Sequence, residues 1–345
     1  MASHALGRLE QGARLVPNPA LLRRPTLQRE AQSTSALEGT YAPIEEVMAA
    51  DLIDSHSRSS ALREVINYIV AAERAFDWID SGRTLTIGLL GELHQLLVSG
   101  TAADTEEAGR IRKIQVVIGS RGGSVYDARF IPAPTGTTLH ASVQDLIDWM
   151  RPDGGEGINS IVKAAMAHYQ FETLHQFNDG NGRIGRLLIV LQLVTDGLIG
   201  QGLLSVSPWF ERRREQYQDL LSEVSASGDW DSWIDFFARG IESSARDTAS
   251  RMSELLEVQA HYHAIITESG TRGVVRDIAD VLIGSPYVTI PFLVSQTGKT
   301  YPAVKTAVAR LIELGVLEER PGASPHLFRA PLVVAVTSRP STAEG

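Results

Sequence analysis

Apolar residues recur at helical spacing over most of the chain. Residues 58–80 place five of them on one helix face, and residues 85–99 predict a second helix. Residues 158–174 carry another apolar stripe, whereas residues 183–199 are apolar almost all round, which is typical of a helix buried at the centre of a bundle. An aromatic-rich stretch at 209–238 supplies bulk for the same core. The pattern predicts a mainly α-helical bundle.

Other segments break this pattern. Residues 1–30 mix proline, arginine and leucine and predict an extended lead-in, followed by a short helix over 30–39 that stops at Gly39. Two β-rich runs around a Gly/Ser loop predict a β-hairpin at 110–132. The last residues, 331–345, show no period and are expected to form a tail.

A separate C-terminal unit is expected at 266–330. Helices at 274–283, 290–297 and 302–314 precede a short β-wing, which is the outline of a winged helix-turn-helix. Residues 276–330 hold six basic and five acidic side chains, so the unit lacks the strong basic surface of a DNA reader. We therefore expect protein docking or oligomer building, and a winged-helix DNA-binding regulator stays open as an alternative function.

Composition narrows the class of protein. The chain has 345 residues, enough for about two or three domains, and a formal net charge of −9 that disfavours coating nucleic acid. It contains no cysteine, which excludes disulfides, a thiolate nucleophile and Cys-ligated metals. No apolar run approaches the roughly 18 residues of a membrane span, and Met1 to Arg14 lack the apolar core of a secretory signal. A cytoplasmic protein is expected.

The segment HQFNDGNGRIGR, residues 175–186, carries the candidate chemistry. The backbone N–H groups of Gly180, Asn181 and Gly182 precede a helix and can converge on an anion. Arg183 and Arg186, three residues apart, project to one side and can each grip phosphate oxygens.

Two further residues of this segment complete the set. Asp179 is placed to hold a hard cation that bridges phosphates, and His175 is a titratable base beside the anion site. The segment also fits the dinucleotide pattern GxGxxG, but that pattern should follow a strand, and a helical period precedes it here. The residues therefore point to attack on a nucleotide phosphate.

The same segment resembles the signature HPFxDGNGRxxR of the Fic (filamentation induced by cAMP) family. The similarity extends to AHYQFETLHQF, GRIRKIQVVIG and SGDWDSWIDFFARGI and covers roughly residues 10–240. It implies a helical bundle with a β-hairpin flap and a protein adenylyltransferase that moves AMP from ATP to a Ser, Thr or Tyr hydroxyl. It also implies an N-terminal helical region at 1–100, a core at 101–265 and a homodimer as an open possibility.

The resemblance assigns roles to the residues of the motif. His175 would be the general base, Phe177 a core anchor, and Asp179 the ligand of Mg²⁺ on the α- and β-phosphates. Asn181 and the N–H groups of Gly180 and Gly182 would hold these phosphates, Arg183 their α/β region, and Arg186 the γ-phosphate. Position 176 is Gln where the family usually has Pro, which removes a bias of His175 away from the right-handed helical region.

An inhibitory element is also implied. Residues 34–39, TSALEG, fit the family pattern (S/T)xxxE(G/N), so Glu38 would pair with Arg186 and displace the γ-phosphate. The same carboxylate could instead orient water to remove AMP, which makes a de-AMPylase the nearest alternative. Phe130 and Ile131 are expected in the wall of the flap, and Tyr217 in the adenine pocket or the core. The protein target remains unknown.

Overall fold

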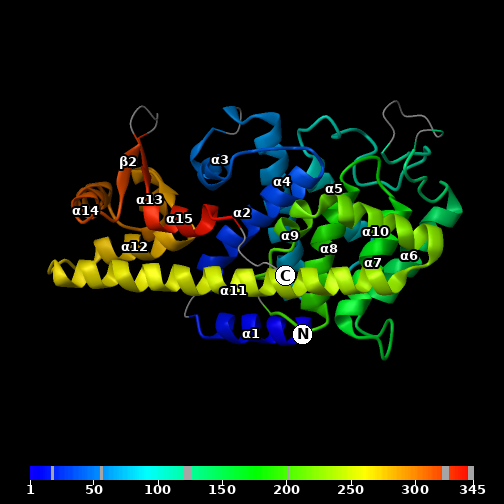
Figure 1. Cartoon of the computed structure of the whole chain (residues 1–345). Helices are drawn as coiled ribbons and strands as arrows, with labels where there is room; N and C mark the ends of the chain where they lie inside the picture. Colours follow the sequence, from blue (N-terminus) through cyan, green and yellow to red (C-terminus); the bar gives the residue numbers. More distant parts are fainter. Residues whose placement is uncertain are drawn as a thin grey trace.

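The computed structural model describes residues 1–16, 19–54, 57–119, 126, 128–200, 202–320 and 326–340. It is mainly helical, as the sequence predicts, and β-strands occur in one small sheet near the C-terminus (Figure 1). Within the described ranges, no helix combines the length and the apolar character that crossing a membrane demands.

The central helices are α7 and α8, which pack against each other beneath the loop of residues 175–180. Helix α7 (Ser160–Leu174) follows α4 (Ser60–Asp80), α5 (Ile87–Val98) and α6 (Thr137–Met150), and α8 spans Asn181–Thr195. Every residue of α8 from Asn181 to Leu193 is buried, in agreement with its apolar sequence. The short α9 (Ser207–Arg212) is followed by α10 (Arg214–Ser227), which lines the site described below.

The N-terminal segment is helical, and the expected extended lead-in is wrong. Helix α1 covers Ala2–Arg14 and α2 covers Ala20–Leu37, ten residues longer at its start than the predicted helix. In α1 the apolar residues Ala2, Ala5, Leu6, Leu9 and Ala13 form one buried face, a helical period that the prolines further on obscured. Short helices α3 (Ile44–Ala49) and η1 (Ala50–Leu52) then lead to α4.

The proline inside α2 explains how the helix meets the C-terminal unit. Pro25 cannot donate a hydrogen bond to the carbonyl of Leu21, four residues earlier. That carbonyl oxygen lies where Gly284 of α12 comes closest, only 2.8 Å from the position that a Cβ atom at residue 284 would take. A side chain there would push the two helices apart, so glycine permits the contact.

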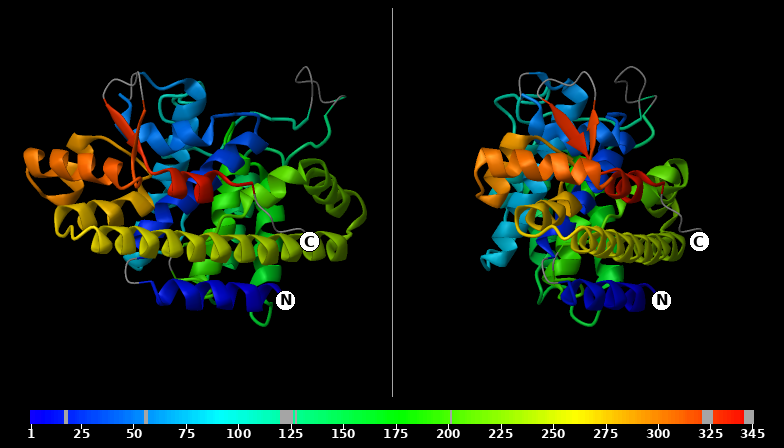
Figure 2. Two further views of the ribbon diagram at one scale, coloured as in Figure 1. Left: turned by 60° about the vertical axis from the view of Figure 1, so that its left-hand side comes forward. Right: turned by 90° about the vertical axis from the view of Figure 1, so that its left-hand side faces the viewer.

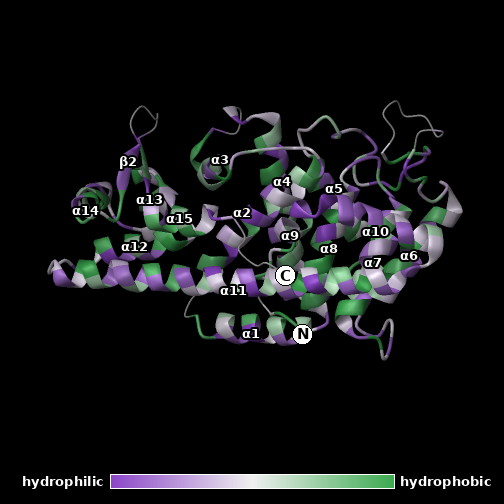
Figure 3. Cartoon of the chain, in the orientation of Figure 1, coloured by the Kyte–Doolittle hydropathy of each residue, from purple (hydrophilic) through white to green (hydrophobic). Residues whose placement is uncertain are grey.

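Helix α11 (Trp230–Glu268) has 39 residues and joins the two parts of the molecule. It extends along the whole bundle, with α1 packed on one side of it (Figure 1). Hydrophilic and hydrophobic bands alternate along it (Figure 3), as expected for a helix that buries one face. The domain boundary expected at 265/266 therefore falls within a continuous helix.

The C-terminal unit contains the three helices that the sequence predicts, α12 (Val274–Gly284), α13 (Ile290–Thr297) and α14 (Tyr301–Glu313). The strands β2 (Glu318–Arg320) and β3 (Leu327–Arg329) follow them, and a further strand that was not expected, β1 (Tyr287–Val288), lies between α12 and α13. The sheet is antiparallel in the order β1-β3-β2, and Val288 and Glu319 both lie opposite Phe328. Figure 2 shows two of its strands as orange-red arrows next to the C-terminal helices. Val288 and Phe328 belong to the same buried cluster as the helical core, whereas Tyr287 packs in a small separate cluster with Met48 and Ala49.

The expected C-terminal tail is partly wrong, because residues Pro331–Ser338 form helix α15. Pro331 starts this helix in the first turn, where proline is well tolerated. Arg251 of α11 donates to the carbonyls of Val336 and Arg339 (2.6 and 2.8 Å), and Arg29 of α2 also donates to Arg339 (2.9 Å). Residues 341–345 lie outside the described part of the chain.

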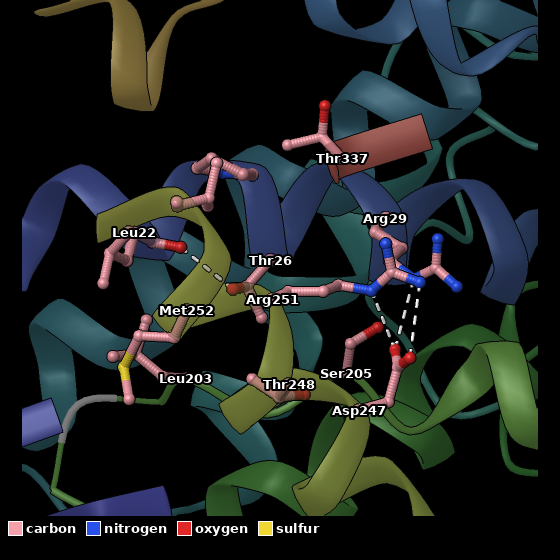
Figure 4. Close-up of a pocket in the computed structure, with 12 residues that line it drawn as sticks. Leu22, Thr26, Arg29, Leu203, Ser205, Asp247, Thr248, Arg251, Met252 and Thr337 are labelled. Atoms are coloured by element: carbon pink, nitrogen blue, oxygen red, sulfur yellow. Dashed lines mark hydrogen bonds and ion pairs between the residues drawn. The ribbon is translucent and has the colours of Figure 1, made fainter. Parts of the chain in front are cut away.

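A buried ion cluster stands behind α15, at the junction of α2, α11 and α15. The guanidinium groups of Arg29 and Arg251 converge on the carboxylate of Asp247, at 3.9 and 2.9 Å (Figure 4). Thr337 of α15 lies at the edge of the same small cavity. The helix that carries Glu38 is thus tied to the C-terminal end of the chain.

The expected β-hairpin is reduced to one contact. Between residues 110 and 132 the described residues form a single antiparallel bridge, Ile118 with Phe130, and no continuous strand. A side chain also links the two arms, because Gln115 Nε2 of the incoming arm donates to Pro132 O of the outgoing arm at 3.0 Å. Residues 120–125 and 127, at the expected tip, lie outside the described residues.

Candidate active site

His175 lies at the point where α7 ends. Its backbone is left-handed, with φ 46° and ψ 56°, and it is the one non-glycine residue with positive φ in the ranges that the structure describes. The left-handed region is uncommon and strained for a residue with a Cβ atom. His175 thus leaves the right-handed helical region although residue 176 is Gln, so the proline usual in the family is not required for this turn.

The loop after His175 is closed by its own side chains. The Asn181 carboxamide accepts from Phe177 N at 2.9 Å and donates to Phe177 O at 2.8 Å. Phe177 is buried and stacks on the ring of His94, with centroids 4.0 Å apart. The Gly180 N–H, in turn, donates to Asp179 Oδ1 at 2.7 Å. These groups shape the loop, and their roles toward phosphate stay predictions.

Arg186 forms the ion pair that the inhibitory pattern suggests. Its Nη2 lies 2.5 Å from Glu38 Oε1, and Nε and Nη2 donate to Thr34 Oγ1 and Thr34 O at 2.7 and 3.0 Å. Burial alone would raise the pKa of Glu38, but the charge and hydrogen bond of Arg186 outweigh it and the pKa is lowered. Glu38 is therefore ionised at neutral pH.

Glycine at position 182 makes this pairing sterically possible. A Cβ atom there would lie 2.0 Å from Glu38 Oε1 and 3.0 Å from Arg186 Nη1. The carboxylate of Glu38 consequently rests against the first turn of α8, where helix N–H groups lack acceptors within the helix. The place that Glu38 occupies is also the place where an anion would be bound.

Arg183 faces a different carboxylate. Its Nη1 lies 3.0 Å from Glu64 Oε2 and its Nη2 lies 3.6 Å from Asp179 Oδ2. The Arg183 side chain is buried, whereas that of Asp179 is 61% exposed. Asp179 contributes to a hollow that also contains His94, apart from the cavity at His175.

The cavity at His175 measures about 450 Å³, within the usual range for a small-molecule site. The end of α2 contributes Leu37 and its C-cap Glu38, the α7 end contributes Glu172, Thr173 and His175, and α8 contributes Gly182 and Arg186. The remaining wall comes from the flap and from α10, and consists of Ile118, Gly119, Arg129, Phe130, Arg214, Tyr217, Gln218, Leu221, Ser222 and Ser225. A base, a guanidinium group and a helix N-terminus therefore open into one space.

The flap residues and Tyr217 differ in their placement. Phe130 lines the cavity, whereas Ile131 is 51% exposed and lies outside the cavity lining. Arg129 pairs with Asp219 of α10 and so links the flap to the opposite wall. Tyr217 is buried, lines the cavity and shares a 2.7 Å hydrogen bond with His168 Nε2, so it belongs to the cavity wall and to the core.

Burial governs the protonation of the groups beneath the cavity. Burial lowers the pKa of His175 to about 4, with Arg112 acting in the same direction and Glu38 against it. Burial also raises the pKa of Glu172 to about 7, since Arg186 only partly offsets it. At neutral pH the imidazole is therefore unprotonated and able to accept a proton.

Sequence analysis missed four residues that support the site: Glu64, His94, Arg112 and Glu172. His94 accepts from the N–H of Gly109 at Nδ1 (2.8 Å), so Nε2 carries its proton and donates to Asp179 O (2.9 Å). Glu172 lies within the quoted stretch AHYQFETLHQF, but its sequence position gives no sign of its contact with α8. Arg112 lies within the quoted stretch GRIRKIQVVIG, but nothing in that stretch indicates its contact with His175. Glu64 and His94 lie more than 80 residues before the motif and carried no pattern of their own.

Comparison with known proteins agrees with this geometry. The family profile described as "Fic/DOC family N-terminal" matches residues 1–77, and the profile described as "Fic/DOC family" matches residues 84–193, together more than half of the chain. The chain belongs to the Fic/DOC family. The N-terminal match includes α2 and the Glu38 carboxylate, and the second match includes the loop 175–180 and Arg186.

Curated relatives of this Fic chain are named protein adenylyltransferases. Protein adenylyltransferase fic-1 of Caenorhabditis elegans is 33% identical over 153 residues, which cover 44% of this chain and 26% of the relative. Protein adenylyltransferase Fic of Nematostella vectensis is 29% identical over 212 residues, 61% of this chain and 44% of the relative. The matches thus span less than half of each of these relatives.

Solved structures show the same fold. A Fic family protein from Desulfovibrio desulfuricans superposes with a TM-score of 0.59 at 22% identity, covering 95% of this chain and 94% of that one. Fic-1 from Caenorhabditis elegans gives a TM-score of 0.55 at 22% identity, covering 73% and 72%. The first alignment includes nearly the whole chain, the C-terminal unit among it.

Proposed function

We propose that this Fic chain is a protein adenylyltransferase that transfers AMP from ATP to a Ser, Thr or Tyr hydroxyl of a protein target. The observation that carries the proposal is the cavity that His175, Arg186 and the first turn of α8 share. Membership of the Fic/DOC family and the names of the curated relatives support the same reaction.

The chemistry follows from these groups. The target hydroxyl oxygen forms a bond to the α-phosphorus of ATP, the bond from that phosphorus to the bridging oxygen of the β-phosphate breaks, and pyrophosphate leaves. His175 takes the hydroxyl proton, because burial keeps its imidazole neutral at physiological pH. Arg186 and the N-terminus of α8 hold the phosphates in line and stabilise their charge.

Asp179 fits a magnesium ion that arrives with the nucleotide. The described residues contain no group of three or more His, Asp or Glu side chains placed to hold a metal ion. Mg²⁺ on a nucleotide needs only one or two carboxylates because phosphates and water complete its coordination, and Asp179 offers one exposed carboxylate. When bound, the ion neutralises phosphate charge. Gly180 and Asn181 keep the Asp179 loop closed.

The structure represents an inhibited state in this proposal. Glu38 forms an ion pair with the guanidinium group of Arg186, which the γ-phosphate would need to contact. The carboxylate of Glu38 also covers the first turn of α8. The partially exposed flap, with Phe130 inside the cavity and Ile131 outside it, is placed to bind an extended target segment along its edge. The proposal for the C-terminal unit remains protein docking, since Lys299, Arg310 and Arg329 pair with carboxylates of the same unit.

The test is incubation with Mg²⁺ and ATP labelled on the α-phosphate. We expect Glu38→Gly to increase auto-AMPylation strongly over the wild type, and His175→Ala to abolish it in the Glu38→Gly background. Equal labelling of all three proteins would contradict the proposal. Incubation of a cell lysate with the Glu38→Gly variant, followed by mass spectrometry, would then identify the target.

A de-AMPylase is a second candidate, because the Glu38 carboxylate faces the same cavity as His175 and could orient water. Protein that has been AMPylated by the Glu38→Gly variant separates the two activities. Release of AMP by the wild type, and its loss on Glu38→Gln substitution, would favour hydrolysis.

A further inference from the structure

Arg112 connects the end of α7 to the chain before the flap. Its side chain is buried, with 2% of its surface exposed. Nε donates to the carbonyl of His175 at 2.8 Å and Nη2 to that of Leu174 at 3.3 Å, while the Arg112 N–H donates to Gln176 O at 2.9 Å. Three successive carbonyls of the left-handed turn thus depend on this one residue.

The same guanidinium group holds both arms of the flap. Nη1 donates to the carbonyl of Ile114 at 3.0 Å on the incoming arm, and Nη2 donates to the carbonyl of Ala133 on the outgoing arm. The two arms are also joined by the bridge between Ile118 and Phe130 and by the side chain of Gln115, which donates to Pro132 O. Arg112 therefore fixes the distance between the base of the flap and the backbone of His175.

No carboxylate pairs with Arg112 within the described ranges, so backbone carbonyls alone balance its charge. A buried cation without a counter-ion is costly unless its donors are satisfied, and the guanidinium fork satisfies four of them at once. Lysine could reproduce the charge but not the planar fork. The geometry favours a positional role for which arginine is required.

We infer that Arg112 is the positioning residue that holds the His175 imidazole in the cavity and sets the flap relative to it, an inference that rests on the proposed function. The turn needs such support because a left-handed non-glycine residue is strained and persists only where its surroundings impose it. Arg112 binds the carbonyl of that very residue. It touches no reacting atom, and its effect passes through His175 and the flap.

The test compares Arg112→Lys and Arg112→Met in the Glu38→Gly background. We expect kcat for AMP transfer to fall about 100-fold in Arg112→Met and about 10-fold in Arg112→Lys, since small misplacements of a base have effects of this size. The dissociation constant for an ATP analogue should change less than about threefold, because Arg112 lies outside the phosphate site. Arg58→Met, which removes another guanidinium bound to a backbone carbonyl (Ala50 O, 2.8 Å), should leave kcat unchanged.

The pH dependence separates positioning from a loss of stability. The positive charge of Arg112 helps to lower the pKa of His175, so Arg112→Met should move the acidic limb of the kcat profile upward and Arg112→Lys should not. NMR titration of His175, assigned with His175→Ala, should show the same upward shift in the imidazole. This readout needs no turnover.

The outcomes are distinguishable. If the Glu38→Gly parent transfers no AMP, the proposed function fails, while the His175 titration still tests the role of Arg112. Folded Arg112→Met protein with parental kcat and parental titration of His175 would overturn the inference. If Arg112→Met does not fold, parental kcat in Arg112→Lys would overturn it equally.

Discussion

The ion pair between Glu38 and Arg186 gives the sharpest thermodynamic prediction. Glu38→Gln keeps the size of the side chain and removes its charge. Arg186 then remains buried, at 2% exposure, with its hydrogen bonds to Thr34 but without its counter-charge. Loss of a counter-charge leaves a buried cation that is incompletely compensated, so the free energy of unfolding should fall.

The magnitude follows from the unequal exposure of the two partners. Removing one partner of a fully buried pair costs about 3–5 kcal/mol, whereas exposed pairs contribute about 0–1 kcal/mol. The Glu38 side chain is 40% exposed and that of Arg186 only 2%, which places this pair between the limits. We expect a loss of about 2 kcal/mol, or roughly 30-fold in the unfolding equilibrium constant.

The assay is urea unfolding at pH 7.5 with and without Mg²⁺ and an ATP analogue that cannot be cleaved between the α- and β-phosphates. Asp235→Asn, which breaks an exposed pair with Arg239 (2.9 Å), is the matched control and should change stability by less than about 1 kcal/mol. The analogue should stabilise Glu38→Gln more than the wild type, because its γ-phosphate replaces the lost carboxylate. Equal stability of variant and wild type, together with equal stabilisation by the analogue, would refute this reasoning.

Three further predictions concern neighbouring groups. Folding raises the pKa of Glu172 from 4.5 to about 7. Between these two pH values the folded protein binds more protons than the unfolded chain, so the free energy of unfolding falls as the pH rises. Glu172→Gln should therefore be up to about 3 kcal/mol more stable than the wild type at pH 8 and nearly equal at pH 4 in urea unfolding, and an effect independent of pH would count against it. Gly182→Ala should cost about 1–3 kcal/mol in the wild type and much less in the Glu38→Gly background, whereas additive losses would show that Glu38 is not the obstacle. Glu64→Gln should free Arg183 and tighten binding of the same ATP analogue about threefold in a calorimetric titration, and unchanged affinity would contradict that.

The helices were predictable from the sequence where the apolar residues that become buried repeat at helical spacing. Residues 58–80, 158–174 and 274–283 became α4, α7 and α12 with ends within two residues of those expected, because their apolar stripes meet the core directly. The N-terminal segment was missed because prolines were interpreted as breaks. Pro25 lies inside α2, where it cannot donate to the carbonyl of Leu21, and that carbonyl faces Gly284 of α12. The surroundings of a proline inside a helix are set by such a distant helix and leave no local pattern.

The residues of the candidate site also fall into those that the sequence could reveal and those that it could not. His175, Asp179 and Arg186 could be found from the sequence, because they lie in one short segment with a characteristic spacing. Glu64 and Arg112 could not, because their partners are 119 and 63 residues away along the chain. The two hydrogen bonds between the Asn181 carboxamide and the backbone of Phe177 likewise depend on the closed loop and could not be predicted from the residue type.

The sequence by itself determined the helical class, the glycine-rich turn before α8 and the presence of a carboxylate at the end of the pattern in residues 34–39, since each depends on residues that are neighbours in the chain. The family resemblance implied that this carboxylate pairs with Arg186, and the structure shows that ion pair. Only the tertiary structure decided that the imidazole is neutral and that Arg112 supports its backbone. The physical reason is that burial and ion pairing are set by segments far apart in sequence, which the packing of α2, α7 and α8 brings together.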